Sequence, residues 1–261
     1  MVNLRKYGRE PFRVAVIHGG PGAPGEMAPV ARELSSVMGI LEPLQTTATL
    51  EGQVREMKAV LAKNAALPVT LIGFSWGALL SFIFTARHPS FVNKLILIGS
   101  APYEAKYALN IMQTRLSRLS EEEREQALSL MRTLNDPSLA DKNTPLARLG
   151  KLLSRADSYD PSPHDDEILE CRFDVFQGVW EQASELRSSG KLLELGKSIR
   201  CPVVAVHGDY DPHPSAGVVE SLSRVLKDFR FILLEKCGHR PWLERSARDR
   251  FYNILKQELA S

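Results

Sequence analysis

The sequence predicts an α/β fold with a mainly parallel, doubly wound sheet and an inserted helical lid. Short, nearly continuous apolar runs alternate with helical stretches, as in a parallel sheet covered on both faces. This alternation stops near residue 102 and resumes near residue 199. Between these positions the chain shows helical signals and no convincing strand.

Six strands are expected, in this order: Phe12–Ile17, 40–44, 69–72, 95–98, 203–206 and 231–234. The second is the weakest, because Pro43 has no N–H to donate and fits only at the edge or end of a strand. Helices are expected between them at residues 25–37, 50–66, 76–87, 216–226 and 242–259.

We expect two parts. Residues 1–101 and 199–261 form the core, and residues 102–198 form the lid. Within the lid, Ser120 and Glu123 form a capping box, and Ser162 followed by Pro163 indicates the start of another helix. The cluster at residues 164–167 can be interpreted as metal ligands, but acids in the first turn of that helix are the preferred explanation. Ligands bind at the carboxyl ends of the strands in such sheets, so we expect the insertion to cover that edge.

Composition excludes several functions. Among 261 residues, 33 Lys and Arg oppose 31 Asp and Glu, which gives no attraction to nucleic acid or anionic membranes. We see no signal-peptide core and no apolar run long enough for a membrane span, so we expect a cytoplasmic protein. The three cysteines (Cys171, Cys201 and Cys237) are far apart and predict neither disulfides nor a zinc site. A homo-oligomer is left open.

Gly73-Phe74-Ser75-Trp76-Gly77 lies between the expected strand 69–72 and the apolar helix that follows. A strand, a tight turn around a serine and a helix are the sequence signature of a nucleophile elbow. Ser75 needs a base to remove its proton and an acid to orient that base. Cys237 is an alternative nucleophile, but a buried structural thiol is the preferred interpretation.

Candidates for the acid and the base follow the last two expected strands. His207-Gly208-Asp209-Tyr210-Asp211 comes after strand 203–206, and Cys237-Gly238-His239-Arg240-Pro241 comes after strand 231–234. Both segments fall at the carboxyl edge of the sheet, where the elbow also lies.

With these motifs the chain resembles the α/β-hydrolase family. The segment His18-Gly19-Gly20-Pro21-Gly22 and Trp76 after the serine resemble its proline iminopeptidase-like branch. The resemblance implies a triad of Ser75, Asp211 and His239, with the backbone N–H groups of Gly20 and Trp76 as the oxyanion hole. Asp209 is the alternative acid.

Other polar and aromatic residues have competing interpretations. His18 is expected to stabilise the oxyanion loop, with direct catalysis as the alternative. His207 and His213 could form a metal site with Asp209, but structural roles are preferred and no metal is expected. An aromatic stripe on a lid helix either packs onto the core or lines the substrate pocket; it comprises Phe173, Phe176 and Trp180. Nearby, Glu170 and Glu181 could bind a substrate amine, although solvated positions are preferred.

The chain also departs from proline iminopeptidases. Residues 44–50 lack the Asp-x-Arg-Gly-x-Gly-x-Ser segment of those enzymes, and the eleven residues before Phe12 are too few for the full hairpin that often begins the fold. We therefore expect a serine hydrolase, acting without a cofactor through an acyl-enzyme on a small ester, thioester or amide. The alternatives are an iminopeptidase-like aminopeptidase and a low-turnover ligand receptor or scaffold.

Overall fold

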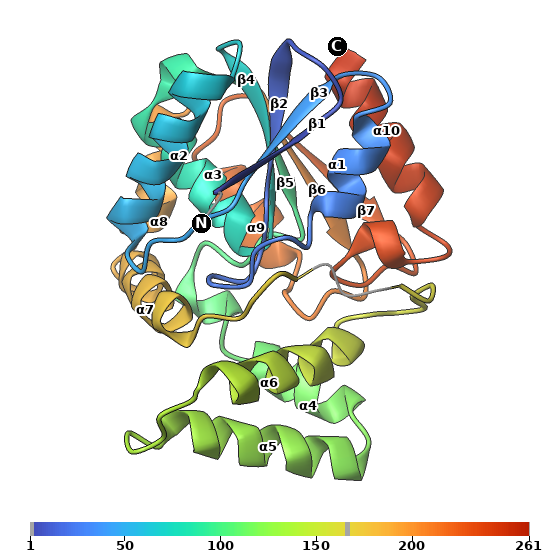
Figure 1. Cartoon of the computed structure of the whole chain (residues 1–261). Coiled ribbons are helices and arrows are strands. Elements are labelled where there is room, and N and C mark those ends of the chain that lie inside the picture. Colours follow the sequence, from blue (N-terminus) through green and yellow to red (C-terminus); the bar gives the residue numbers. More distant parts are fainter. Residues whose placement is uncertain (1–2, 165–167, 261) are drawn as a thin grey trace.

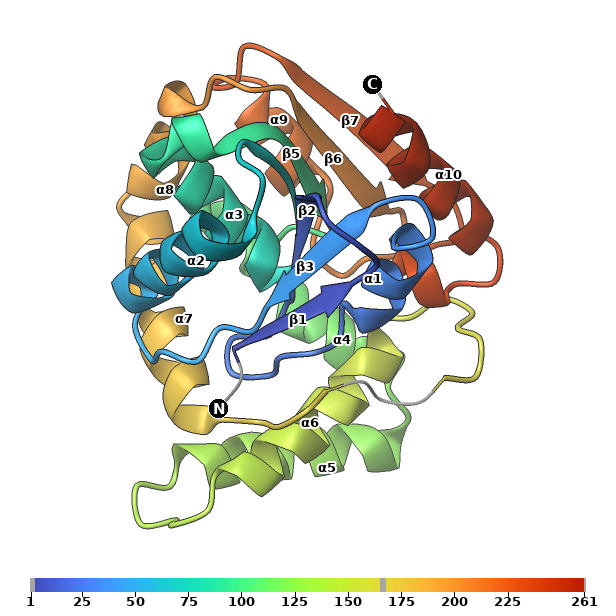
Figure 2. The ribbon, with the colours of Figure 1, turned by 45° about the horizontal axis from the view of Figure 1, so that its top comes forward.

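The computed structural model describes residues 3–164 and 168–260. Within them, seven strands form one sheet in the order β1-β3-β2-β4-β5-β6-β7, with β1 and β7 at its edges (Figure 1 and Figure 2). The pairing of β1 with β3 is antiparallel and the other pairs are parallel. The strands are β1 (Leu4–Tyr7), β2 (Phe12–Ile17), β3 (Gly39–Pro43), β4 (Val69–Phe74), β5 (Val92–Ile98), β6 (Val203–Gly208) and β7 (Phe229–Leu234).

All six expected strands are confirmed, and β1 is an addition that the sequence did not predict. The β1 sequence, Leu-Arg-Lys-Tyr, has two basic residues at its centre and therefore no apolar run. It lies at an edge of the sheet, where the Tyr7 hydroxyl donates a 2.7 Å hydrogen bond to Glu42 of β3. Pro43 is the last residue of β3, the position in which a missing N–H is tolerated.

Helices cover both faces of the sheet (Figure 1). One face packs against α1 (Ala28–Leu34) and α10 (Arg248–Ala260). The opposite face packs against a larger group, which comprises α2 (Leu50–Asn64), α3 (Trp76–Arg87), α7 (Phe173–Ser188), α8 (Lys191–Glu194) and α9 (Ala216–Leu222). Short 3₁₀ turns complete the fold at η1 (Pro89–Phe91), η2 (Ala105–Tyr107), η3 (Leu195–Ser198) and η4 (Pro241–Leu243). No described helix has the length and apolarity needed to span a bilayer.

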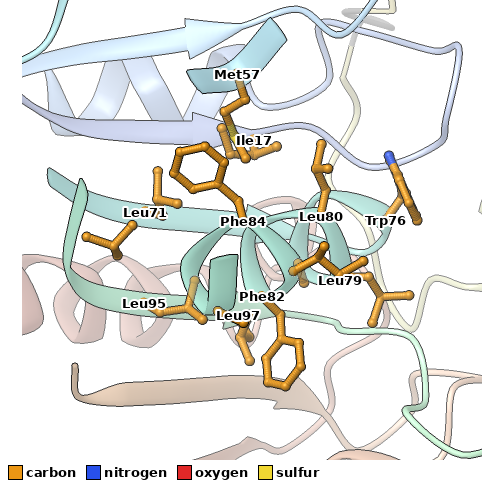
Figure 3. Packing of buried hydrophobic residues seen from close by; sticks show 14 of the residues in the cluster. Ile17, Met57, Leu71, Trp76, Leu79, Leu80, Phe82, Phe84, Leu95 and Leu97 are labelled. Atoms are coloured by element: carbon orange, nitrogen blue, oxygen red, sulfur yellow. The ribbon is translucent and has the colours of Figure 1, made fainter. Parts of the chain in front are cut away.

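Helix α3 runs through the centre of the core. Figure 3 shows Leu80 and Phe84 pointing toward Ile17 of β2, while Phe82 points the opposite way. Every residue from Trp76 to Ala86 is buried. A helix that is apolar on all sides is stable only inside the protein, so the elbow that precedes it is held on a rigid element.

The inserted segment between β5 and β6 has two parts. Helices α4 (Ile111–Arg118), α5 (Glu121–Asn135) and α6 (Asn143–Ala156) form their own hydrophobic cluster and lie as a separate layer beyond the sheet (Figure 1). Ser120 and Glu123 make both hydrogen bonds of the expected capping box at the start of α5. By contrast, α7 and α8 contribute buried side chains to the same core cluster as α3.

Three expected helix starts are wrong. Gly25 adopts a φ of +112°, so α1 begins only at Ala28. The stretch at Trp242 forms the turn η4, and α10 begins at Arg248. The helix expected at Pro163 is absent from residues 162–164, because the core holds this segment: the Ser162 N–H donates to the Leu243 carbonyl at 2.7 Å. Residues 165–167, the acids assigned to its first turn, lie outside the described residues.

Candidate active site

Ser75 lies between the end of β4 and the start of α3 with a strained backbone, φ 52° and ψ −113°. Its N–H donates a 2.9 Å hydrogen bond to the Ile98 carbonyl at the end of β5. A Cβ atom on Gly77 would lie 2.2 Å from the Ile17 carbonyl oxygen, and one on Gly73 would lie 2.3 Å from the Gly77 oxygen. Only glycine fits at these two positions, and the close approach that it permits keeps Ser75 at the tip of the turn.

His239 contacts both of its expected partners. Its Nε2 lies 3.0 Å from Ser75 Oγ, and its Nδ1 lies 2.7 Å from Asp211 Oδ2. Asp209 lies elsewhere: its Oδ1 accepts a 3.1 Å hydrogen bond from the backbone N–H of Cys237. The structure therefore brings Ser75, His239 and Asp211 together and gives Asp209 a role in ordering the loop.

The second oxygen of Asp211 is bound by His213. Asp211 Oδ1 accepts the His213 backbone N–H at 2.9 Å and the ring Nδ1–H at 2.8 Å. His207 approaches Oδ2 at 3.6 Å and also contacts the His213 carbonyl oxygen through Nε2 at 2.8 Å. Both histidines thus contact Asp211. The metal-site alternative had grouped them with Asp209, which lies two residues earlier in the chain.

These contacts set the charges at the site. Burial opposes ionisation of Asp211, but His239, His207 and His213 outweigh it and hold the pKa of the carboxyl well below its usual range. Burial alone would lower the pKa of His239, but the Asp211 carboxylate raises it above its ordinary value. Burial lowers the pKa of His213 to about 4, so its ring is neutral at pH 7 and donates from Nδ1.

Asp211, His213 and His239 also have the spacing of a possible metal site, since one ligand atom from each lies within 4.8 Å of the others. His213 Nδ1 and His239 Nδ1 both make hydrogen bonds to Asp211 in the structure. A metal ion bound to those atoms would replace both hydrogen bonds and release His239 from its acid.

The two backbone N–H groups expected to form the oxyanion hole come from different loops. The N–H of Trp76 is the first of α3 and therefore has no acceptor within the helix. Gly20 lies in the loop after β2 that also carries His18.

His18 is fully buried, with Nδ1 2.7 Å from the Gly19 oxygen and Nε2 3.3 Å from the Gln45 nitrogen. Burial lowers the pKa of its ring to about 4. A neutral ring that bridges two loops fits the structural interpretation of His18.

The inserted helices hold the backbone of the histidine loop. The His239 N–H donates a 2.8 Å hydrogen bond to the carbonyl oxygen of Asp157, which directly follows α6. The Asp157 carboxylate in turn accepts two 2.7 Å hydrogen bonds from Arg115 of α4. Sequence reasoning missed both residues, because nothing near them in the chain indicates a contact with residue 239.

Glu244 fixes the same region from the core side. Its fully buried carboxylate accepts backbone N–H groups from Tyr159, Asp160 and Gly238 at 2.9, 2.7 and 3.0 Å. This one side chain therefore joins the segment after α6 to the residue before His239.

The aromatic stripe of α7 lies beside the elbow helix. The Trp180 ring centroid is 6.5 Å from that of Trp76, and Phe176 stacks on Trp180 at 6.4 Å. Phe173 lies 6.3 Å from Phe176, between ring centroids, and also packs against the cluster formed by α4, α5 and α6. Of the two candidate acids, Glu181 is exposed and accepts a 3.0 Å hydrogen bond from Gln177. Among the described residues, the stripe approaches the elbow through the ring of Trp76 rather than through Ser75 itself.

Cys237 is buried, and burial raises the pKa of its thiol far above the ordinary value. Its Sγ lies 3.4 Å from the carbonyl oxygen of Gly238. A protonated, enclosed thiol is a poor nucleophile, which favours the structural interpretation of this residue.

A surface cleft of about 490 Å³ lies between α1 and the start of α10. Trp242 lines it and packs edge-on against Phe74 at 4.7 Å. Ser75, Asp211 and His239 are not among its lining residues. The cleft is thus distinct from the hydrogen-bonded chain at the elbow.

Several solved structures share the fold. VinJ superposes with a TM-score of 0.70 at 20% identity, over 98% of this chain and 94% of that one. The proline iminopeptidase of Mycobacterium smegmatis gives 0.64 at 17% identity over 98% and 93%. A monoacylglycerol lipase from Paleococcus ferrophilus gives 0.64 at 16% identity over 98% and 97%. At these identities the similarity shows the fold alone.

A search of curated protein sequences finds no match. The model of the alpha/beta hydrolase fold family, however, matches residues 21–246, most of the chain. This match agrees with the sheet order and with the placement of helices on both faces. The chain therefore belongs to the α/β-hydrolase fold family.

Proposed function

We propose that the protein is a serine hydrolase that forms an acyl-enzyme on Ser75. The observation that carries this proposal is the continuous hydrogen-bonded chain from Ser75 Oγ through His239 to Asp211, with contacts of 3.0 and 2.7 Å. Ser75, Asp211 and His239 come from three separate loops, so their alignment is not a by-product of local structure. The strained backbone of Ser75 adds support, because such strain concentrates at functional sites.

The geometry supports a defined sequence of proton transfers. His239 Nε2 removes the proton from Ser75 Oγ as the oxygen attacks the substrate carbonyl carbon. The negative oxygen of the tetrahedral intermediate then accepts hydrogen bonds from the N–H groups of Gly20 and Trp76, each worth about 3 kcal/mol. His239 next protonates the leaving group, and the same nitrogen activates water to release the acyl group. Asp211 stabilises the imidazolium throughout.

The substrate is a small ester, thioester or amide. An ester with a good leaving group is the simplest probe, because acylation then needs little help from binding. We expect hydrolysis of p-nitrophenyl butyrate by the wild type and none above the buffer rate by Ser75→Ala. Equal rates for these two proteins, with equal thermal midpoints, would contradict the proposal.

An iminopeptidase-like aminopeptidase is the second candidate. It is favoured by the segment from His18 to Gly22 and by the fold shared with the proline iminopeptidase of Mycobacterium smegmatis. Comparison of kcat/KM for proline p-nitroanilide and p-nitrophenyl butyrate separates the two. A preference for the amide would identify the aminopeptidase, and a preference for the ester the esterase. A receptor or scaffold would turn over neither substrate.

A further inference from the structure

The aromatic stripe on α7 continues to a buried arginine. With 3.6 residues per turn, Phe173, Phe176, Trp180 and Arg187 lie within about 60° of one another around the helix axis. The Arg187 guanidinium carbon is 5.5 Å from the Trp180 ring centroid. The three aromatic side chains keep part of their surface exposed, so solvent reaches this side of α7.

Arg187 is buried, and no acidic side chain among residues 3–164 and 168–260 forms an ion pair with it. Only 8% of its surface is exposed, and its Nε donates a 2.8 Å hydrogen bond to the Pro102 carbonyl oxygen. Its Nη2 is buried and has no hydrogen-bond partner in the described part of the chain. Burial lowers the pKa of the guanidinium, yet an arginine stays charged in proteins, so an unpaired cation remains in the interior. An unpaired buried charge lowers the stability of the fold unless a ligand of opposite charge binds to it.

This arginine lies on the same edge of the sheet as Ser75. Pro102, its hydrogen-bond partner, is three residues after Gly99, and three residues span at most about 11 Å. A Cβ atom on Gly99 would lie 3.0 Å from His239 Nδ1. The Trp180 ring in turn approaches the ring of Trp76, the residue after Ser75. Arg187 therefore lies at the same end of the sheet as Ser75, on the helix whose Trp180 packs against Trp76.

We propose that Arg187 binds a carboxylate at the far end of the substrate acyl group, so that the protein prefers ω-carboxyacyl esters, thioesters or amides. In this arrangement Phe176 and Trp180 cover the apolar body of the acyl chain, and Nη2 donates to the carboxylate. The carboxylate pairs the buried charge of Arg187, for which the described residues supply no anion. The inference rests on the proposed serine-hydrolase function and adds the chemical class of its substrate.

Two esters of equal acyl length test the preference. We expect kcat/KM for mono-p-nitrophenyl glutarate to exceed that for p-nitrophenyl valerate by about tenfold to a hundredfold, mostly through KM, as for a charge-assisted hydrogen bond. Arg187→Met abolishes the preference, and Arg187→Lys retains part of it. The control Arg132→Met removes an exposed arginine of α5 and leaves the ratio of the two kcat/KM values unchanged. A purely structural Arg187 would instead move the thermal midpoint and both rates together. Equal rates on the two esters in the wild type overturn the proposal even if Arg187→Met fails to fold.

A binding measurement in Ser75→Ala separates this inference from the proposed reaction. Glutarate raises the thermal midpoint of Ser75→Ala more than neutral glutaramide does, and the addition of Arg187→Met removes the difference. Glutarate binding through Arg187 without hydrolysis of either ester would contradict the serine hydrolase but support the carboxylate site. Hydrolysis of both esters at equal rates, with no effect of glutarate, would overturn the site and leave the serine hydrolase intact.

Discussion

Asp211 Oδ2 lies 2.7 Å from Nδ1 of His239, on the side of the ring opposite Ser75. The carboxylate fixes both the tautomer and the direction of the imidazole, because a proton on Nδ1 leaves Nε2 free to accept one from the serine. Asp209, only two residues away, is directed to the backbone of Cys237 instead.

Substitutions at the two aspartates should therefore differ. In Asp211→Asn we expect kcat to fall by about ten-thousandfold, because the amide favours the wrong tautomer of His239. Asp209→Asn keeps an acceptor for the Cys237 N–H, so its kcat should stay within about tenfold of the wild type. Steady-state rates on p-nitrophenyl butyrate measure both. A near-normal rate in Asp211→Asn together with an inactive Asp209→Asn would reassign the acid.

His213 should act on catalysis through Asp211. Protonation of His239 removes the base, so kcat/KM falls as the pH drops through its raised pKa, and the acid limb lies above the ordinary histidine value of about 6.5. His213→Phe removes a donor from the carboxylate, which then stabilises the imidazolium more strongly and moves the acid limb to higher pH. His213→Asn keeps a donor and should shift the limb less. Identical pH profiles for all three proteins would exclude this role.

Glu244 should support both stability and catalysis. Its carboxylate satisfies three backbone N–H groups, so Glu244→Ala should cost about 3 kcal/mol or more of the free energy of unfolding, measured with urea. It should also lower kcat, because Gly238 precedes His239. Glu235→Ala, at an exposed position, is the control and should change neither quantity. A Glu244 variant as stable as that control would contradict the assignment.

The elbow should not accept a methyl group. Gly77→Ala places a Cβ atom against the carbonyl oxygens of Ile17 and His18, which are backbone atoms that cannot move aside, and should cost about 3 kcal/mol or more. Gly150→Ala is the matched control: its Cβ meets nothing within 4 Å, and in α6 it should stabilise by about 0.5 to 1 kcal/mol. Urea unfolding that shows equal changes for the two variants would refute the packing argument.

The parts of the site that the sequence predicted are those defined by local patterns. Ser75, Asp211 and His239 each follow an apolar strand directly, so the parallel sheet brings them to one edge. The contact of Asp157 with His239 joins residues 82 positions apart, between the insertion and the loop after β7, and no local pattern encodes such a pairing. The metal-site alternative grouped His207 and His213 with Asp209, whereas both histidines lie against Asp211. The direction of a carboxylate within a loop depends on its tertiary contacts, which no local pattern encodes.

The sequence did not predict strand β1 or the starts of three helices, and the reasons are related. An edge strand buries little of its surface on the outer side, so charged residues are tolerated in β1. The prediction relied on apolar runs, and β1 has none. At Pro163 the chain has a good local signal for a helix, but the hydrogen bond from Ser162 to Leu243 holds the segment against the core. Tertiary contacts override local propensity in such cases.

Covalent labelling of Ser75 tests the central claim most directly. The folded wild type is incubated with a fluorophosphonate, and the modified peptide is identified by mass spectrometry. We predict one phosphonyl group on Ser75 in the wild type, much slower labelling in His239→Ala, and none in Ser75→Ala. Absence of label from Ser75 in folded wild-type protein, or equal labelling of Ser75→Ala at another residue, would contradict the assignment of Ser75 as the nucleophile.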